Sequence, residues 1–184
     1  MKYDLCHASK DFIRESGVLI DSLIYSETKA LKDAENSSVF ESFCSFALPL
    51  LKTGEEISES LLYLSSYEPL IEIAEMAICE LCSARKGLTE GKKSDDFKCT
   101  QKDKYFFSEN AEKIMKRLFD DLVSSDISER LCCDYIRYMI CILEGTVRLC
   151  EAASVCEKNE NILATEAASR NLMHRMRGLL SLIK

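Results

Sequence analysis

The sequence contains few of the residues that turn or interrupt a polypeptide chain. Its 184 residues include 6 Gly, 2 Pro and no Trp. An all-β fold needs such residues between many short strands, so their scarcity argues against that fold class. The two histidines, His7 and His174, are far apart, and the E-x-x-H sequences of di-iron helical bundles are missing. The chain also lacks a Gly-rich phosphate-binding loop and a Ser-His-Asp signature.

The chain also has fewer basic than acidic residues. The chain has 24 Lys and Arg against 31 Asp and Glu, which gives a formal net charge of -7. A surface of this sign repels nucleic acid, so nucleic-acid binding is not expected. No uncharged run is long enough to span a membrane, and the first residues contain no apolar signal segment. We therefore predict a soluble, cytoplasmic protein without a membrane partner.

Cysteine, in contrast, is abundant, with 10 residues. A secreted disulfide framework is normally shorter, rich in loops and preceded by a signal segment. Most of these cysteines instead lie within segments of helical periodicity, where Cys acts as a small hydrophobic residue. The pattern predicts reduced thiols, most of them in the core.

Residues 126–157 are predicted to form a helix that the rest of the chain packs around. Charged side chains within it recur at spacings of three, four or seven residues, which places them along one stripe of a helix. Almost all the other positions are apolar, and a helix that is apolar over most of its circumference is buried on most sides. The stripe contains Arg130, Asp134, Arg137, Glu144, Arg148 and Glu151, and the buried line contains Ile136, Met139, Leu143 and Val147.

Capping signals divide the first half of the chain. Ser38 with Glu41 forms a capping box and predicts that a helix begins there. Pro49 is expected to kink or end that helix, because proline lacks a backbone donor and clashes with the preceding turn. Thr53 with Glu56 forms a second capping box, which predicts a restart.

The remaining signals complete an all-α fold. A helix is predicted from Pro69 to about Lys86, and Asn159 is predicted to begin the last helix. Residues 87–107 are polar and contain glycines and lysines, so we predict a mobile loop there. Residues 1–184 are thus expected to form a single domain, an antiparallel helical bundle of about five or six helices.

Carboxylates are concentrated in residues 51–75. Glu55, Glu56 and Glu59 form E-E-x-x-E, and Glu72 with Glu75 forms E-x-x-E. This pattern resembles that of the all-α nucleotide pyrophosphohydrolases, although that family has Asp at the position of Glu75. The resemblance implies a Mg²⁺ ion held by these carboxylates against a diphosphate, since hard cations prefer oxygen ligands. The alternative is a solvated acidic face, because acids are also favoured in the first turn of a helix.

A second pattern overlaps the first and mixes acids with thiols. Its members are spaced by four or three residues and share one helix face, opposite the apolar positions, so the thiols are expected at the surface or at an interface. The Cys79–Cys82 pair could bind a soft metal ion or become oxidised, and an oligomer interface is favoured over both. The pattern consists of Glu68, Glu72, Glu75, Cys79 and Cys82.

Basic residues gather near the C-terminus, where Arg170, His174, Arg177 and Lys184 share one stripe. Cations stabilise the C-terminal end of a helix, and they are expected to pair with the Glu-rich third helix. The alternative is that they bind an anionic partner.

These patterns favour a non-catalytic protein that acts by binding other protein, including a second copy of itself. No cofactor is predicted for that function. The alternative is the Mg²⁺-dependent nucleotide pyrophosphohydrolase that uses the Glu55, Glu56, Glu59, Glu72 and Glu75 carboxylates.

Overall fold

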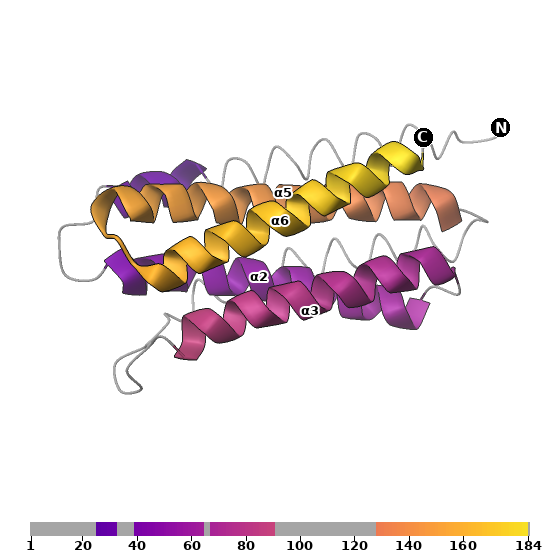
Figure 1. Cartoon of the computed structure of the whole chain (residues 1–184), viewed down its shortest axis with the longest axis horizontal. Helices are drawn as coiled ribbons and strands as arrows, with labels where there is room; N and C mark the ends of the chain where they lie inside the picture. The colour runs from indigo at the N-terminus through magenta and orange to yellow at the C-terminus, as the bar shows by residue number, and fades with distance from the viewer. Residues whose placement is uncertain (1–24, 33–38, 65–66, 91–127, 184) are drawn as a thin grey trace.

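The structure is a computed structural model that describes residues 25–32, 39–64, 67–90 and 128–183. These parts of the chain contain long helices and a short helical segment, 25–32, and they contain no strand (Figure 1). The predicted all-α helical bundle is therefore confirmed. The long helices are α2 (Val39–Leu64), α3 (Glu68–Glu90), α5 (Ser128–Cys156) and α6 (Glu160–Leu182).

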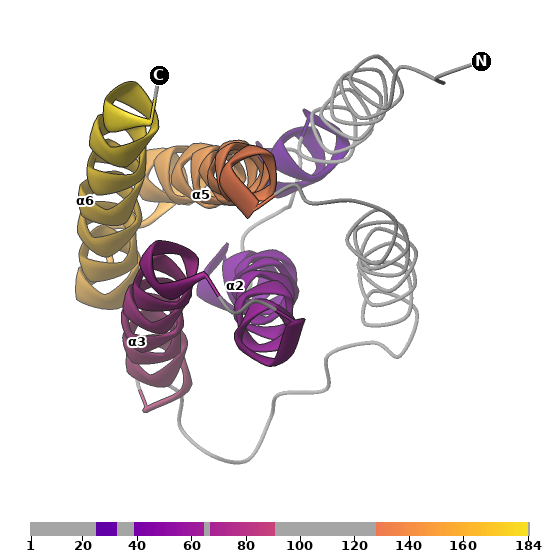
Figure 2. The ribbon, with the colours of Figure 1, turned by 90° about the vertical axis from the view of Figure 1, so that its right-hand side faces the viewer.

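The four long helices form a ring. Helix α2 contacts α3 and α5, and α6 contacts the same two helices from the other side. The view along the bundle shows this arrangement, with α2 and α3 in one layer and α5 and α6 in the other (Figure 2). Neighbours in the ring run antiparallel, as the colour gradient along each helix shows (Figure 1). Each long helix therefore buries two sides against its neighbours in the ring.

Helix α5 is the most enclosed of the four. Segment 25–32 lies against it on the side away from α6, so α5 is covered on three sides (Figure 2). Ile136, Met139 and Leu143 are completely buried, and Val147 is 5% exposed. The central helix predicted for 126–157 is thus confirmed, with bounds that differ by one or two residues. Within the described parts of the chain, no helix has the combination of length and apolar character needed to cross a membrane.

Three helices meet at Gly54 of α2. A Cβ atom at this position would lie 2.9 Å from Leu81 Cδ1 of α3 and 3.4 Å from Met139 Cε of α5. The 2.9 Å contact is shorter than real Cβ contacts, so a side chain at Gly54 would force the tip of Leu81 to shift, whereas the contact with Met139 is of ordinary length. Leu81 and Met139 are almost fully buried, which places this contact in the core.

A buried polar contact lies one helical turn further along α2. The Ser58 hydroxyl donates to the carbonyl of Gly54 at 2.8 Å, and its oxygen lies 2.7 Å from the Tyr135 hydroxyl of α5. Because the single Ser58 hydrogen is used in the first bond, Tyr135 donates in the second. Both side chains are fully buried, and burial raises the pKa of Tyr135 above its ordinary value. The neutral phenol is therefore the form that links α2 to α5.

The predicted end of a helix at Pro49 and its restart at Thr53 are wrong. Helix α2 continues through Pro49 without interruption, and Thr53 is not an N-cap. The Thr53 hydroxyl instead donates to the Pro49 carbonyl at 2.9 Å, as it does inside a helix. Tertiary packing overrides the local signal here, because Ala47, Leu50 and Leu51 on either side of the proline are buried in the core.

The boundaries of the other helices agree with the sequence more closely. Asn159 is the N-cap of α6, and its side-chain oxygen accepts from the backbone N–H of Asn161 at 2.9 Å. Helix α3 continues past Lys86 to Glu90, so the predicted loop at 87–107 does not begin at Gly87. Leu88 explains the extension, because it is completely buried seven residues after Leu81 on the inward side. Residues 91–107 lie outside the described parts of the chain.

Replacing Leu143 by Ala tests the central position of α5. We expect the free energy of unfolding to fall by about 2 to 5 kcal/mol, because the change leaves a cavity in the core. Arg137 is the control, since it is on the same helix with 42% of its side chain exposed and pairs only locally with Asp134. Arg137→Ala should cost about 1 kcal/mol or less. Urea unfolding followed by circular dichroism measures both, and the reverse order of effects would contradict this packing.

Candidate functional site

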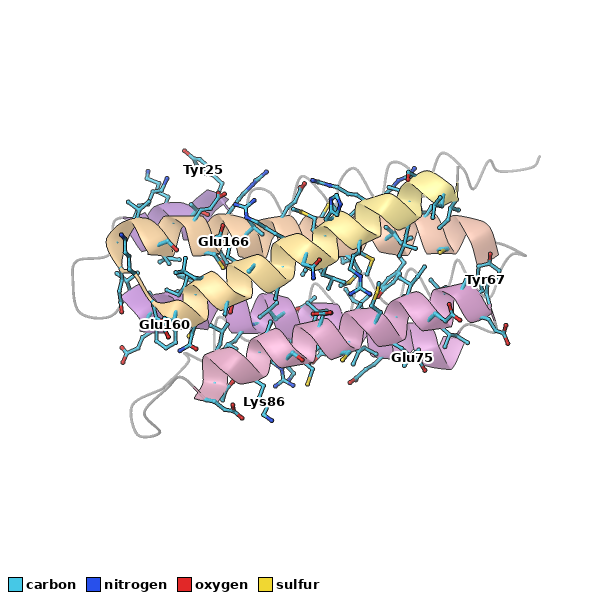
Figure 3. The ribbon with its side chains drawn as sticks, in the orientation of Figure 1. Tyr25, Tyr67, Glu75, Lys86, Glu160 and Glu166 are labelled. Carbon is cyan, nitrogen blue, oxygen red and sulfur yellow. The ribbon has the colours of Figure 1, made fainter. Side chains whose placement is uncertain are left out.

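The outer side of α3 carries the pattern of acids and thiols that the sequence predicts. All five residues are exposed, whereas the positions on the opposite side of the helix are buried in the core. Glu75 lies on the side of α3 away from α6 (Figure 3). The predicted surface position of the thiols is therefore confirmed. We call Glu68, Glu72, Glu75, Cys79 and Cys82 the α3 stripe.

The three acids of the α3 stripe have no ion-pair partner among the residues that the structure describes. From Glu68 to Cys82 the stripe contains no cation, and the two basic residues that follow it pair elsewhere, Arg85 with Glu55 at 2.8 Å and Lys86 with Glu90 at 3.5 Å. Most other acids of the bundle are paired, for example Glu80 with Arg175 at 3.3 Å. Within the described ranges, the stripe is thus a line of carboxylates without paired cations.

Beneath the end of the stripe, Arg85 connects α3 to α2. Its Nε atom donates to Glu55 Oε1 at 2.8 Å, and this bond raises the pKa of Arg85 above its ordinary value. The Glu55 side chain is 9% exposed and that of Arg85 is 40% exposed. The nearby Cys82 thiol also contributes to the raised pKa of Arg85, although less than Glu55 does. A nearly buried acid, a cation and an exposed thiol are therefore adjacent at the α2–α3 contact.

The carboxylates that resemble those of the nucleotide pyrophosphohydrolases are not brought together. Glu55 is paired with Arg85, and Glu56 lies 3.6 Å from Lys52. Within the described ranges no group of three or more His, Cys, Asp or Glu side chains could hold a metal ion. The other members, Glu59, Glu72 and Glu75, are exposed.

The basic stripe near the C-terminus is largely used inside the protein. Arg170 lies between Glu166 of its own helix, at 2.9 Å, and Glu151 of α5, at 2.5 Å. Arg177 pairs with Glu144 of α5. The predicted pairing with the Glu-rich third helix holds for Arg175 and Glu80, but Arg170 and Arg177 pair with α5.

The other two members of this basic stripe are His174 and Lys184. His174 is exposed on α6, and Lys184 lies outside the described residues. The hydrogen bonds to Glu166 and Glu151 raise the pKa of Arg170, as expected for a cation held between carboxylates. This arrangement ties α6 to its neighbours and leaves few cations for an anionic ligand.

The cysteines fall into two groups. Cys44, Cys132 and Cys150 are buried, and burial raises the pKa of Cys132 to about 11 and that of Cys150 further. Cys79, Cys82 and Cys156 are exposed, and Cys133 and Cys141 lie between these extremes. The eight described cysteines are free thiols. The prediction of core thiols thus holds for part of the set.

A shallow depression of about 310 Å³ lies between segment 25–32 and the end of α5. This volume is at the lower limit of ligand pockets, which typically measure about 300–1,000 Å³. Two of its lining residues are mostly exposed, Tyr25 at 72% and Val155 at 82%, so the depression does not enclose a ligand. Its lining consists of Tyr25, Thr28, Lys32, Arg148, Glu151, Ala152 and Val155.

The sequence patterns did not identify Arg85 as part of this region. One local signal was present, because Arg85 follows Cys79 and Cys82 at the same three-residue spacing. Its pairing with Glu55, thirty residues earlier on another helix, has no local signal. Comparisons with family models, curated proteins and solved structures found no match to this chain. The function is therefore argued from the exposure, charge and contacts of the residues themselves.

Changing Arg85 to Leu tests the α2–α3 ion pair. The change leaves the nearly buried Glu55 carboxylate without its cation, so we expect a loss of about 1–3 kcal/mol in the free energy of unfolding. The lower part of this range applies, because solvent screens the partly exposed Arg85. Adding Glu55→Met should restore much of the loss, since the lone buried charge is then removed. Urea unfolding of the wild type, the two single variants and the double variant measures the coupling between Arg85 and Glu55. If the losses of the two single variants simply add in the double variant, the pairing is contradicted.

Thiol labelling tests the division of the cysteines. With iodoacetamide at pH 8, Cys79, Cys82 and Cys156 should be modified first because they are exposed. Cys132 and Cys150 should stay protected, since burial blocks access and holds both thiols in the neutral form at that pH. Peptide mass spectrometry at successive times gives the order, and early modification of Cys150 would contradict the packing of α5 against α6.

Proposed function

We propose that this chain is a non-catalytic protein-binding module, and that its partner is a basic protein segment that contacts the α3 stripe. One observation carries the proposal, namely the unpaired carboxylates of Glu68, Glu72 and Glu75 on a single exposed helix face. Basic side chains on a partner would supply the positive charge that the described part of the chain does not place beside these carboxylates. Charge complementarity of this kind guides association and selects partners.

The dimensions of the stripe suit a helix or an extended segment as the partner. At about 1.5 Å per residue, the distance along α3 from Glu68 to Cys82 is about 21 Å. That length matches roughly four turns of a partner helix, whose basic residues at every third or fourth position would face the carboxylates. The same face carries two exposed thiols, which is unusual because cysteine is among the residue types most often buried.

A second copy of the chain is a less suitable partner for this face. The arginines of α6 already pair with Glu80, Glu144 and Glu151 of the same chain. A second copy would have to break these pairs to present the arginines of α6, whereas a separate basic segment would not. We therefore propose a heterologous partner and treat self-association as a competing result.

The catalytic alternative is not carried forward, because no observation on the described residues favours it. The carboxylates that it needs point to different surroundings, with Glu55 held by Arg85 and Glu75 at the outer surface. For the compartment we propose the cytoplasm, since exposed free thiols such as Cys79 and Cys82 persist where thiols are kept reduced.

A pair of charge reversals tests the proposed binding face. The probe is a fluorescently labelled, Lys-rich amphipathic peptide that forms a helix, and fluorescence anisotropy measures its affinity. Glu72→Lys with Glu75→Lys should weaken binding about tenfold, which corresponds to about 1.4 kcal/mol, because attraction becomes repulsion. Raising the salt concentration should weaken wild-type binding in the same direction.

The matched control reverses two exposed acids elsewhere, with Glu157→Lys and Glu160→Lys at the turn between α5 and α6. It changes the net charge by the same amount and should alter peptide affinity no more than about twofold. An equal loss in both variants, or no wild-type binding, would contradict the proposal. Self-association that Glu72→Lys with Glu75→Lys abolishes in sedimentation experiments would identify a second copy as the partner instead.

A further inference from the structure

Cys79 and Cys82 place two thiols one helical turn apart on the exposed side of α3. Both are free and exposed, whereas the thiols of α2 and most of those of α5 are buried or half-buried. Neither contributes to the core that α3 shares with its neighbours. Packing therefore does not explain why cysteine occupies these two positions.

The spacing of the pair decides what the two sulfur atoms can form. On a helix, residues three apart have Cβ atoms about 5–6 Å from each other. A disulfide needs a Cβ separation of about 3.8 Å, so it would require local compression of the helix. A metal ion held between two sulfurs, each at about 2.3 Å, keeps the sulfurs about 4.6 Å apart instead of the roughly 2 Å of a disulfide bond, so binding it does not require the Cβ atoms to approach.

The residues between the two thiols resist such compression. Leu81 is 1% exposed and packs into the space beside Gly54 of α2. Glu80 is held by Arg175 of α6 at 3.3 Å. Moving Cys79 toward Cys82 would disturb both contacts, so the structure of α3 favours a bridge by a metal ion over a disulfide.

The ligand set narrows the choice of metal. Structural zinc needs four ligands, and in the described ranges no third His, Cys, Asp or Glu side chain joins this pair. Soft thiolates select Cu(I), which accepts two sulfur ligands. Two thiolates and one Cu(I) ion carry a net negative charge, and Arg85 offers compensation because its terminal nitrogens are not used by Glu55, which binds Nε.

We propose that Cys79 and Cys82 form a two-coordinate site for Cu(I) on the outer face of α3. Binding forms two sulfur–copper bonds and releases both thiol protons to solvent, and no electron is transferred. The inference is independent of the proposed protein partner, because the acids of the α3 stripe are not ligands.

Competition with a coloured Cu(I) chelator tests the site on the reduced, full-length chain without oxygen. The wild type should remove a Cu(I) ion from the chelator, and Cys79→Ser with Cys82→Ser should weaken that affinity by at least about tenfold. Cys156→Ser is the matched control, because Cys156 is a single exposed thiol at the end of α5. It should bind as the wild type does. Retention of the ion by the double variant, or equal loss in the control, would overturn the proposal.

A second measurement addresses the disulfide directly. Glutathione disulfide would convert the two thiols into a disulfide and release two molecules of glutathione. We expect intact-mass and peptide analysis to find no stable Cys79–Cys82 disulfide under conditions that modify Cys156. A stable disulfide with an unchanged melting temperature would show that α3 tolerates the compression, and it would overturn the spacing argument for copper.

Discussion

The close approach of three helices at Gly54 fixes where the rest of the bundle can lie. Leu81 from α3 and Met139 with Ile142 from α5 fill the space that a side chain at this position would occupy. Interiors packed at crystal-like density leave little freedom to shift, so this contact limits how far α3 and α5 can move relative to α2. Because Leu81 must face inward, Cys79 and Cys82 must lie toward the outside.

Two polar residues of α2 near Gly54 stabilise the contacts of α2 with α3 and with α5. Glu55 reaches α3 through Arg85, and Ser58 reaches α5 through Tyr135. A buried polar group that loses its partner costs about 1–3 kcal/mol, so both contacts disfavour any other register of the helices. The ion pairs of α6 differ, because they are exposed to solvent, which screens them. The α2–α3–α5 contact is thus the firmly specified part of the bundle.

Sequence patterns correctly predicted the features that depend on a single helix. The buried line of α5, the Asn159 cap and the exposed α3 stripe all follow from helical periodicity or local capping, and all are observed. Local signals failed at Pro49 and at the end of α3, where packing of buried neighbours such as Leu88 outweighs propensity. Contacts between helices, such as that of Arg85 with Glu55, were beyond prediction because periodicity says which side a residue faces but not what it meets.

The order of contacts around the ring has a consequence for how the chain folds. Helices α2 and α3 follow each other closely in sequence, and so do α5 and α6, so each pair can form an antiparallel hairpin from local contacts. Such contacts form quickly, because little chain entropy is lost in closing a short loop. The Ser58–Tyr135 contact joins residues 77 positions apart and forms only when the two hairpins dock. We therefore expect docking of the two hairpins to be the slow step of folding. The side of α5 that packs against α2 is then the last surface to be buried.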